Sequence, residues 1–351
     1  MTKKAEKTRA RELADEVNAA FAKRGVAVRM GSDDCFRRDV VPTGSLLFDA
    51  MMDGGLRTGT VVELYGRPNS GKSFLAYKAM ASAQRLWPDR TVAWFDFEGK
   101  FSPEFAERCG IDVANLAAER PEYAEEGVDV MEQMLRSGAV SVVVCDSVAA
   151  MVPKADYDES AEHSSMATRA RLMSKALPKL VAANKHAALL IFINQIREKL
   201  GVMWGSPTTT TGGHALGHYA AQQFEVRRAS VLKEPVRAWD YKKGEWAEEE
   251  RAVGHMIGVN VVKDHVTGKE HSTCQIPFKV DMAGIDEAAE LVIRGQQTGA
   301  IAKKGGGYYE VAGQKLKGRP ALWEWVRSQE PETLRAMIEP AESNEEGEGD
   351  G

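Results

Sequence analysis

The stretch Thr60-Val-Val-Glu-Leu-Tyr-Gly-Arg-Pro-Asn-Ser-Gly-Lys-Ser-Phe-Leu-Ala-Tyr-Lys-Ala-Met-Ala-Ser82 decides the fold. An apolar run of strand length ends at Tyr65, a glycine-rich turn follows, and a helical pattern begins behind the turn. The turn has the spacing G-x-x-x-x-G-K-S. Its position between a strand and a helix distinguishes a P-loop from a chance glycine turn. The sequence therefore predicts a nucleotide-binding site here.

This loop supplies the groups that a nucleoside triphosphate needs. Its glycines let backbone N–H groups close around phosphates, and the N-terminus of the helix favours anions. Lys72 is expected to reach the β- and γ-phosphates, and the Ser73 hydroxyl is expected to bind Mg²⁺. The predicted nucleotide contacts in the loop are Gly66, Arg67, Pro68, Asn69, Ser70, Gly71, Lys72, Ser73 and Phe74.

Composition indicates a globular protein without a membrane segment. The 351 residues are 43% hydrophobic and 28% charged, enough for one large domain and one or two small ones. No apolar stretch is long enough to span a bilayer, and the N-terminus is charged rather than signal-like. The four cysteines show no metal-ligand spacing, and Cys145 lies in an apolar run that predicts a core position. We expect a reducing, cytoplasmic location.

The charge is unevenly distributed along the chain. The formal net charge is −5, but six acidic residues follow Arg335, the last basic residue. Without those six the remainder is near +1, since −5 plus 6 is +1. Net charge therefore neither favours nor excludes a nucleic-acid partner.

Residues from Pro42 to about 285 alternate between strand and helix patterns. The runs 91–98, 140–146 and 187–194 are almost continuously apolar, as expected of parallel strands buried on both faces. We therefore predict a doubly wound α/β core, in which ligands bind beyond the carboxyl ends of the strands. Polar residues stand at three of these strand ends: Asp96, Glu98, Asp146, Ser147, Asn194 and Gln195.

Three of these strand-end residues have a chemical role to fill. Asp146 ends an apolar strand as a Walker B aspartate does, and it would hold Mg²⁺ through water. Glu98 is the candidate base for the water that attacks the γ-phosphate, and Gln195 could sense that phosphate by hydrogen bonding. For any one of them alone, helix capping is the competing explanation. Behind a P-loop, their coincidence favours the functional interpretation.

A long loop without regular structure is predicted from Ile196 to Gly213. It contains basic residues, an apolar tip at Val202-Met203-Trp204 and a run of threonines. These features suit a mobile contact with single-stranded nucleic acid, and a substrate lid is the competing hypothesis. Because the loop begins directly after Gln195, the state of the bound nucleotide could order or release it.

The N-terminus is predicted to form an amphipathic helix over residues 3–24, with Leu13, Val17 and Phe21 at four-residue spacing. A short strand over Val26–Met30 should follow. It has no hairpin partner nearby, and such a strand can pair with a sheet edge on a neighbouring subunit.

Four segments together resemble the RecA family of bacterial and phage strand-exchange recombinases. They are Pro42-Thr-Gly-Ser45, the P-loop, Val144-Cys-Asp-Ser-Val-Ala-Ala150, and Phe192-Ile-Asn-Gln-Ile-Arg197 through Gly212-Gly213. The similarity runs from about residue 10 to 338. It implies a RecA-type P-loop core that forms a helical filament on single-stranded DNA, with ATP and Mg²⁺ between adjacent subunits. It also implies DNA-stimulated ATP hydrolysis, and pairing and strand exchange with homologous double-stranded DNA.

The resemblance also assigns residues. Phe105 occupies the place of an adenine-stacking ring, Ser147 belongs to the nucleotide site, and Lys263 would reach the γ-phosphate of the neighbouring subunit. The N-terminal helix and strand would pack on that neighbour. Two loops, 156–167 and 196–211, would line the DNA. The full set of predicted DNA contacts is Met166, Arg169, Arg171, Arg197, Lys199, Val202, Met203, Trp204, Thr210, Gly212 and Gly213.

The chain departs from the family pattern at several points. His265 stands where the family has a second interface lysine, Gly217-His218 replaces a Lys-Phe pair, and Pro178 replaces a basic residue. These changes bear on how strongly ATP and DNA are coupled. Residues 233–252 are longer than the family segment. We favour a solvated hairpin there over a contact with a partner or duplex.

The predicted organisation is an N-terminal helix and strand (1–33), an ATPase core (34–285), a small C-terminal domain of helices and a short hairpin (286–338), and a disordered acidic tail (339–351). The C-terminal domain carries basic residues that could gather duplex DNA or could form a solvated face: Lys303, Lys304, Lys315, Lys317 and Arg319. Two other functions stay open at this point. One is a ring-forming DNA motor, and the other is an ATP- and DNA-binding filament scaffold that exchanges no strands.

Overall fold

The computed structural model describes residues 9–21, 23, 27–33, 36–158, 166–198, 208–210, 213–240, 245–280 and 284–339. The chain divides into two compact units, Met1–Asp39 and Val40–Gly351.

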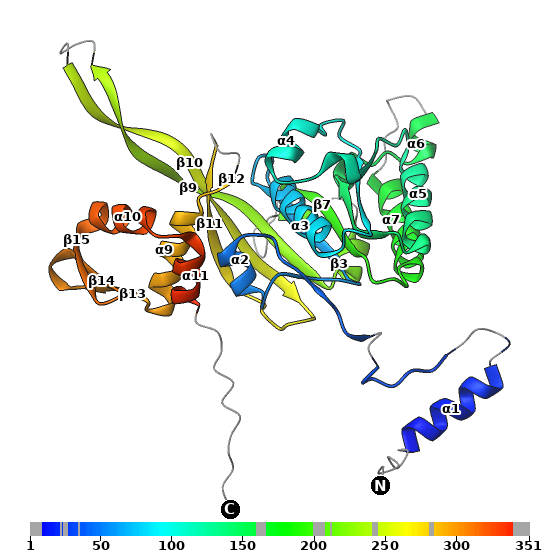
Figure 1. Ribbon diagram of the computed structural model, residues 1–351. Helices are drawn as coiled ribbons and strands as arrows, with labels where there is room; N and C mark the ends of the chain where they lie inside the picture. The colour runs from blue at the N-terminus through cyan, green and yellow to red at the C-terminus, as the bar shows by residue number, and fades with distance from the viewer. Residues whose placement is uncertain are drawn as a thin grey trace, which may run out of the picture. The chain divides into compact units, whose positions relative to one another are not determined.

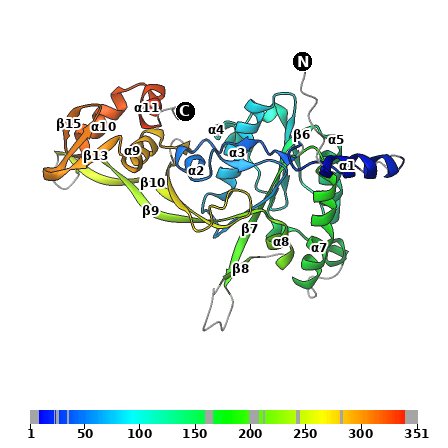
Figure 2. The same ribbon diagram turned by 90° about the horizontal axis from the view of Figure 1, so that it is seen from below.

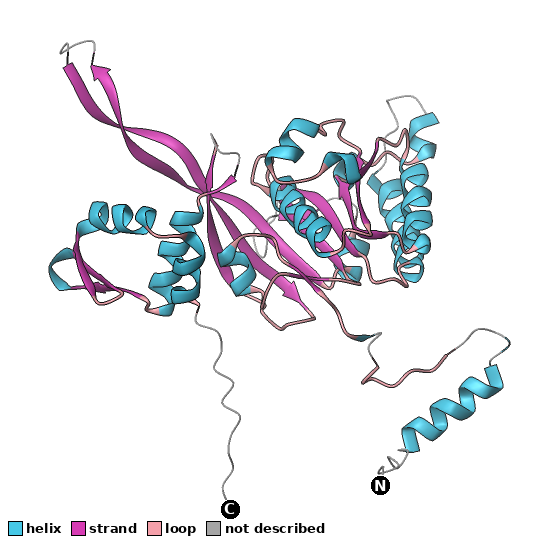
Figure 3. Cartoon of the chain, viewed as in Figure 1, coloured by secondary structure: helices cyan, strands magenta, loops and turns pink. Residues whose placement is uncertain are grey.

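A ten-stranded sheet forms the centre of the larger unit (Figures 1 and 3). Nine strands follow the order β12-β11-β10-β9-β3-β7-β6-β4-β5, and β8 pairs with β7. Every neighbouring pair from β9 to β5 is parallel, whereas β9 to β12 pair antiparallel. The predicted doubly wound, mostly parallel α/β sheet is confirmed. The strands are β3 (Val61–Gly66), β4 (Thr91–Asp96), β5 (Leu116–Glu119), β6 (Val140–Asp146), β7 (Leu189–Glu198), β8 (Thr208–Thr210), β9 (Gln222–Asp240), β10 (Glu245–Asp264), β11 (Thr273–Lys279) and β12 (Gly284–Ile285).

Helices cover both faces of the parallel strands because successive side chains of a strand point to opposite faces. Helices α3 (Lys72–Leu86) and α4 (Pro103–Arg108) pack on one face. Helices α5 (Ala124–Ser137), α7 (Met166–Ala183) and α8 (His214–Tyr219) pack on the other. No helix among the described residues is long and apolar enough to cross a membrane.

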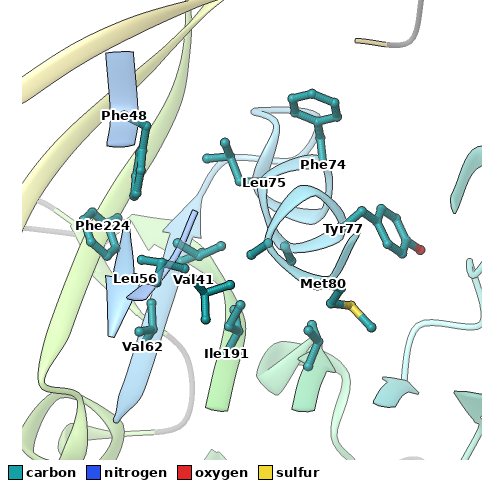
Figure 4. Close-up of a cluster of buried hydrophobic side chains, with 14 of the residues drawn as sticks. Val41, Phe48, Leu56, Val62, Phe74, Leu75, Tyr77, Met80, Ile191 and Phe224 are labelled. Atoms are coloured by element: carbon teal, nitrogen blue, oxygen red, sulfur yellow. The ribbon is translucent and has the colours of Figure 1, made fainter. Parts of the chain in front are cut away.

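The core on the α3 side joins distant parts of the chain (Figure 4). Tyr77 stacks on Trp94 with 4.2 Å between ring centroids, and Phe48 meets Phe224 at 5.2 Å. Each large side chain of this kind stabilises the fold by about 1.5–3 kcal/mol when fully buried. Cys145 is buried in the core on the opposite face, as predicted. The P-loop and the strand ends are therefore held on a rigid base.

The Pro42–Ser45 segment joins the core to the C-terminal domain. It follows the small ribbon strand β1 (Val40–Val41), which pairs with β2 (Leu56–Arg57), and it leads into α2 (Leu46–Met51). The Ser45 side chain caps α2 and also donates to the Glu290 carboxylate on α9 (Glu287–Thr298). The amide N–H of Leu46 donates to the same carboxylate at 3.0 Å. Burial raises the pKa of Glu290 to about 7, although these hydrogen bonds oppose the rise.

The C-terminal domain contains the predicted short hairpin, β13–β14, to which a third strand adds to make a three-stranded antiparallel sheet. The turn Gly305–Gly307 joins the first two strands. Residues Gln314–Lys317 form the third strand, which pairs with the second. The local sequence did not indicate this third strand. The elements are β13 (Ile301–Lys304), β14 (Tyr308–Val311), β15 (Gln314–Lys317), α10 (Gly318–Ser328) and α11 (Pro331–Ile338).

The smaller unit contains α1 (Arg9–Phe21), within the predicted N-terminal helix. Residues 27–30 pair with no strand among the described residues of their own chain. The strand at Val26–Met30 is expected to pair on a neighbouring subunit, and it stays a prediction. The Asn18 side chain donates to the Val28 carbonyl at 2.9 Å and accepts from the Val28 N–H at 2.5 Å. A strand is held by hydrogen bonds to the backbone of a partner strand. Here the Asn18 side chain bonds both backbone groups of Val28, as a residue of a partner strand would.

The predicted loops are partly regular. Strand β7 continues to Glu198 and pairs with β8, so Arg197 lies opposite Thr209. The prediction of a loop without regular structure from Ile196 to Gly213 is therefore wrong at both stems. The ends of the 156–167 loop are also helical, because α6 (Lys154–Asp158) and the start of α7 occupy them.

Candidate functional site

The P-loop lies between β3 and α3, as its sequence predicted. Gly66 must be glycine, because a Cβ there would lie 1.9 Å from the Val226 carbonyl oxygen. Gly71 caps α3 with φ +103°, a left-handed conformation that glycine adopts without strain. These two glycines let the loop curl tightly at the N-terminus of a 15-residue helix.

The Lys72 ammonium already lies inside this loop. It donates to the carbonyl oxygens of Gly66 at 3.1 Å and Arg67 at 2.8 Å. Burial lowers the pKa of Lys72, and the negative charges of Asp146 and Glu98 oppose that shift. A buried positive charge at the N-terminus of a helix is suited to phosphate oxygens.

The strand ends β4, β6 and β7 bring the predicted polar residues together beside the loop. The Ser73 hydroxyl donates to the Asp146 carboxylate at 2.9 Å. Burial raises the pKa of Asp146 to about 6, and the neighbouring charges of Glu98 and Asp96 add to the rise. The peptide bond between Asp146 and Ser147 is cis. Two oxygen ligands of the type that Mg²⁺ prefers therefore lie side by side.

Glu98 accepts hydrogen bonds from three side chains. One carboxylate oxygen accepts from the Ser147 hydroxyl at 2.6 Å and from the Gln195 amide at 2.7 Å. The other lies 2.6 Å from the Lys100 ammonium. Burial alone would raise the pKa of Glu98, but the hydrogen bonds from Lys100, Ser147 and Gln195 outweigh it and lower the pKa. Glu98 is thus ionised near neutral pH and oriented by three donors.

Asp96, at the end of β4, holds the turn that follows the strand. It is buried, and it accepts a hydrogen bond from the Phe101 backbone N–H at 2.9 Å. That bond closes the turn carrying Glu98, so Asp96 positions the candidate base rather than joining it.

A cavity of about 330 Å³ opens beside the loop. Phe105 lines it, together with Arg228 and His255 from β9 and β10, which the sequence had not singled out. The buried Ser70 hydroxyl and His255 Nδ1 have no hydrogen-bond partner among the described residues. Buried polar atoms without partners mark places where a ligand completes the hydrogen bonding. Polar groups and an aromatic ring fit a nucleotide, and Ser73 with Asp146 fits its Mg²⁺.

The predicted DNA-binding residues are only partly placed. Arg169 donates to the Met151 carbonyl at 2.7 Å and so holds the turn Val148–Ala150, while Arg171 is exposed on α7. Gly213 caps α8 with φ +76°. Met166 begins α7, and Arg197 and Thr210 lie on paired strands. The other predicted contacts lie outside the described residues: Lys199, Val202, Met203, Trp204 and Gly212.

Lys263 is engaged within its own chain. Its ammonium donates to the carbonyl oxygens of Gly217 at 2.8 Å and Ala220 at 2.7 Å, at the C-terminal end of α8. Unpaired carbonyls at a helix C-terminus attract cations. A role toward a neighbour's phosphate would require Lys263 to leave these carbonyls.

Comparison with known proteins agrees with this geometry. The family model described as the RecA N-terminal domain matches residues 10–278. The chain belongs to the RecA family. A curated relative, Protein RecA of Acidothermus cellulolyticus, is 38% identical over 301 residues, which cover 84% of this chain and 80% of the relative. Membership carries the general functions of the RecA family, recombination with ATP binding and DNA binding.

Sequence analysis assigned no structural role to three polar residues near this RecA site: the buried Glu63 and Asn194, and the half-buried Gln223. A signal for Glu63 was present, since a lone carboxylate in the apolar run 61–65 must find partners when buried. Its partners come from β7 and β9, 131 and 160 residues away, so they were not visible locally.

Proposed function

We propose that this chain is a DNA-dependent ATPase that assembles as a helical filament on single-stranded DNA in the cytoplasm. In that form it pairs the strand with homologous duplex DNA and exchanges strands. The proposal rests on the family, and on one observation above all. Glu98 accepts a hydrogen bond from Gln195 at 2.7 Å, and Gln195 lies on the strand that runs directly into the β7–β8 ribbon. Gln195 thus contacts the candidate base and directly precedes the proposed DNA loop, so it links the two.

The residues divide the chemistry between them. Lys72 and the P-loop amides would bind the β- and γ-phosphates of ATP, with the adenine near Phe105. Ser73 and, through water, Asp146 would hold Mg²⁺, which neutralises phosphate charge when bound. Glu98 is ionised and would accept a proton from the attacking water. Gln195 would exchange its bond to Glu98 for one to the γ-phosphate, which would shift the first residues of the ribbon.

Exposed apolar residues on α1 and behind it support the proposed self-assembly. Leu13 on α1 and Val28 behind it are exposed in the single chain, at 61% and 44%. An apolar helix face followed by an extended segment suits docking on a second copy. In a filament Lys263 would turn from α8 toward the neighbour's ATP, with His265 beside it.

The decisive test is ATP hydrolysis with and without single-stranded DNA across a salt series. Stimulation that fades as salt rises is expected, because phosphate contacts release counterions. Hydrolysis indifferent to DNA would point to the scaffold without exchange activity. Short closed rings instead of filaments in electron micrographs would point to the motor.

A further inference from the structure

A row of polar residues, buried at Glu63 and half-buried at Gln223 and Lys263, crosses the sheet beneath α8. The register places Glu63 of β3 opposite Gln223 of β9, and Gln223 opposite Lys263 of β10. Glu63 and Asn194 are both 0% exposed. A carboxylate taken fully out of water needs strong hydrogen bonds to remain there.

Two side-chain amides supply such bonds to Glu63. Asn194 Nδ2 donates to one carboxylate oxygen at 2.8 Å, and Gln223 Nε2 donates to the other at 2.6 Å. The side-chain oxygen Oδ1 of Asn194 in turn accepts from the Gln195 backbone N–H at 2.9 Å. The Gln195 side chain continues to Glu98. An unbroken chain of hydrogen bonds therefore runs from Gln223 to the candidate base.

The other end of the row meets α8. A Cβ at Gly217 would lie 3.5 Å from Gln223 Nε2, so α8 passes directly over Gln223. Lys263 beside it holds the C-terminal carbonyls of α8. Burial lowers the pKa of Lys263, and the charges of Glu270 and Glu63 oppose that shift.

Through Asn194 and Gln223, one buried carboxylate is thus linked to both flanks of the segment 196–213. Gln195 immediately precedes that segment, and α8 immediately follows it. We propose that Glu63 is a positioning residue that couples the nucleotide site to DNA. With Asn194 and Gln223, it transmits a shift of Gln195 to α8 and Lys263, so that the segment's entry and exit move together. The inference rests on the proposed DNA-dependent ATPase.

The geometry offers a swap of donor and acceptor as the test. Glu63→Gln leaves two amides facing each other, and Asn194→Asp sets two carboxylates 2.8 Å apart. In the double variant, the amide at 63 donates to the carboxylate at 194. That carboxylate still accepts from the Gln195 N–H, so both the buried charge and the chain of bonds are restored.

The readout is the ratio of ATP turnover with saturating single-stranded DNA to turnover without it, measured alongside thermal unfolding. Each single variant is expected to lower this ratio at least tenfold, and the double variant to recover it to within about threefold of wild type. Single variants that keep the ratio, or a folded double variant that does not recover it, would overturn the proposal.

A second pair of variants tests the relay at Gln223, which is half-buried, with the fully buried Gln222 as its control. Gln223→Met removes the donor to Glu63 at a half-buried position and should lower the ratio. Gln222→Met, next to it on β9, removes a donor to Asp264 instead and should leave the ratio unchanged. Equal ratios for the two variants would contradict the relay. If wild type itself shows no stimulation, the proposed function fails and not merely the role of Glu63.

Discussion

Asp146 illustrates how a functional residue can oppose stability. Its pKa is raised from 3.8 to about 6, chiefly by burial. A group with a raised folded pKa contributes stability below its unfolded pKa, and that stability is lost as pH rises through the folded value. Above pH 6 the folded protein therefore holds an ionised carboxylate at a cost of up to about 3 kcal/mol.

We expect Asp146→Asn to stabilise the nucleotide-free protein and weaken its use of Mg²⁺. At pH 8 the free energy of unfolding should rise by about 1–3 kcal/mol, and the gain should vanish near pH 4, where wild type is protonated too. Affinity for ATP in the presence of Mg²⁺ should fall roughly tenfold or more. Denaturant titrations at both pH values and equilibrium nucleotide binding measure these effects. A destabilised variant at pH 8 would contradict the assigned cause of the pKa shift.

Glu98→Gln tests the candidate base directly. The amide keeps the size of the side chain but cannot take a proton, so turnover should fall by about 10²–10⁴ while ATP binding persists. Single-turnover hydrolysis measures the loss of turnover, and equilibrium nucleotide binding measures whether ATP affinity is retained. Lys100→Ala is the matched control, because it removes the 77% exposed partner of Glu98 and leaves the carboxylate in place. Wild-type turnover in Glu98→Gln would remove Glu98 from the mechanism.

At the scale of the element, the β7–β8 ribbon carries the proposed DNA tip. Replacing Met203 and Trp204 with Ala should weaken single-strand binding by about 1–3 kcal/mol for each stacked base that is lost. Fluorescence anisotropy with an oligonucleotide measures the change. Unchanged affinity would favour the substrate lid for this segment.

The β9–β10 ribbon extends well beyond the sheet (Figures 1 and 2). Pairing with β11 reaches only Gly254, whereas β9 and β10 stay paired out to Asp240 and Glu245. We expect that replacing residues 235–250 with Asn-Gly, which suits a two-residue hairpin, leaves stability within about 0.5 kcal/mol and ATP turnover unchanged. A loss of duplex binding or of filament formation would instead identify the ribbon as a contact surface.

What could be predicted from sequence follows from how local each feature is. The P-loop and each parallel strand consist of contiguous residues with a characteristic pattern, so their positions and their structure could be predicted. The β7–β8 pairing joins stems across a nine-residue gap, and Glu63 meets Asn194 and Gln223 only after the sheet forms. Polar residues at strand ends indicated the site, while the residues that position them came from the tertiary fold.

Across the whole molecule, charge is distributed more sharply than its net value of −5 suggests. In the C-terminal sheet, Lys304 of β13 lies beside Tyr308, which lies beside Lys317 of β15. Lys315 shares that face by the two-residue period of a strand. Lys303 belongs to the opposite face, in register with the buried Tyr309. The predicted basic patch is thus divided between the two faces of one small sheet.

This division provides a controlled test of duplex capture. Replacing Lys304, Lys315 and Lys317 with Gln should weaken double-stranded DNA binding and flatten its dependence on log salt by about one for each lost phosphate contact. Lys303→Gln removes a charge from the other face and should leave the slope nearly unchanged. Lys304 also pairs with Glu310 at 3.3 Å, so its share should be smaller than that of Lys317. Equal loss from Lys303→Gln and Lys317→Gln would mean that the domain attracts DNA by overall charge, without a preferred face.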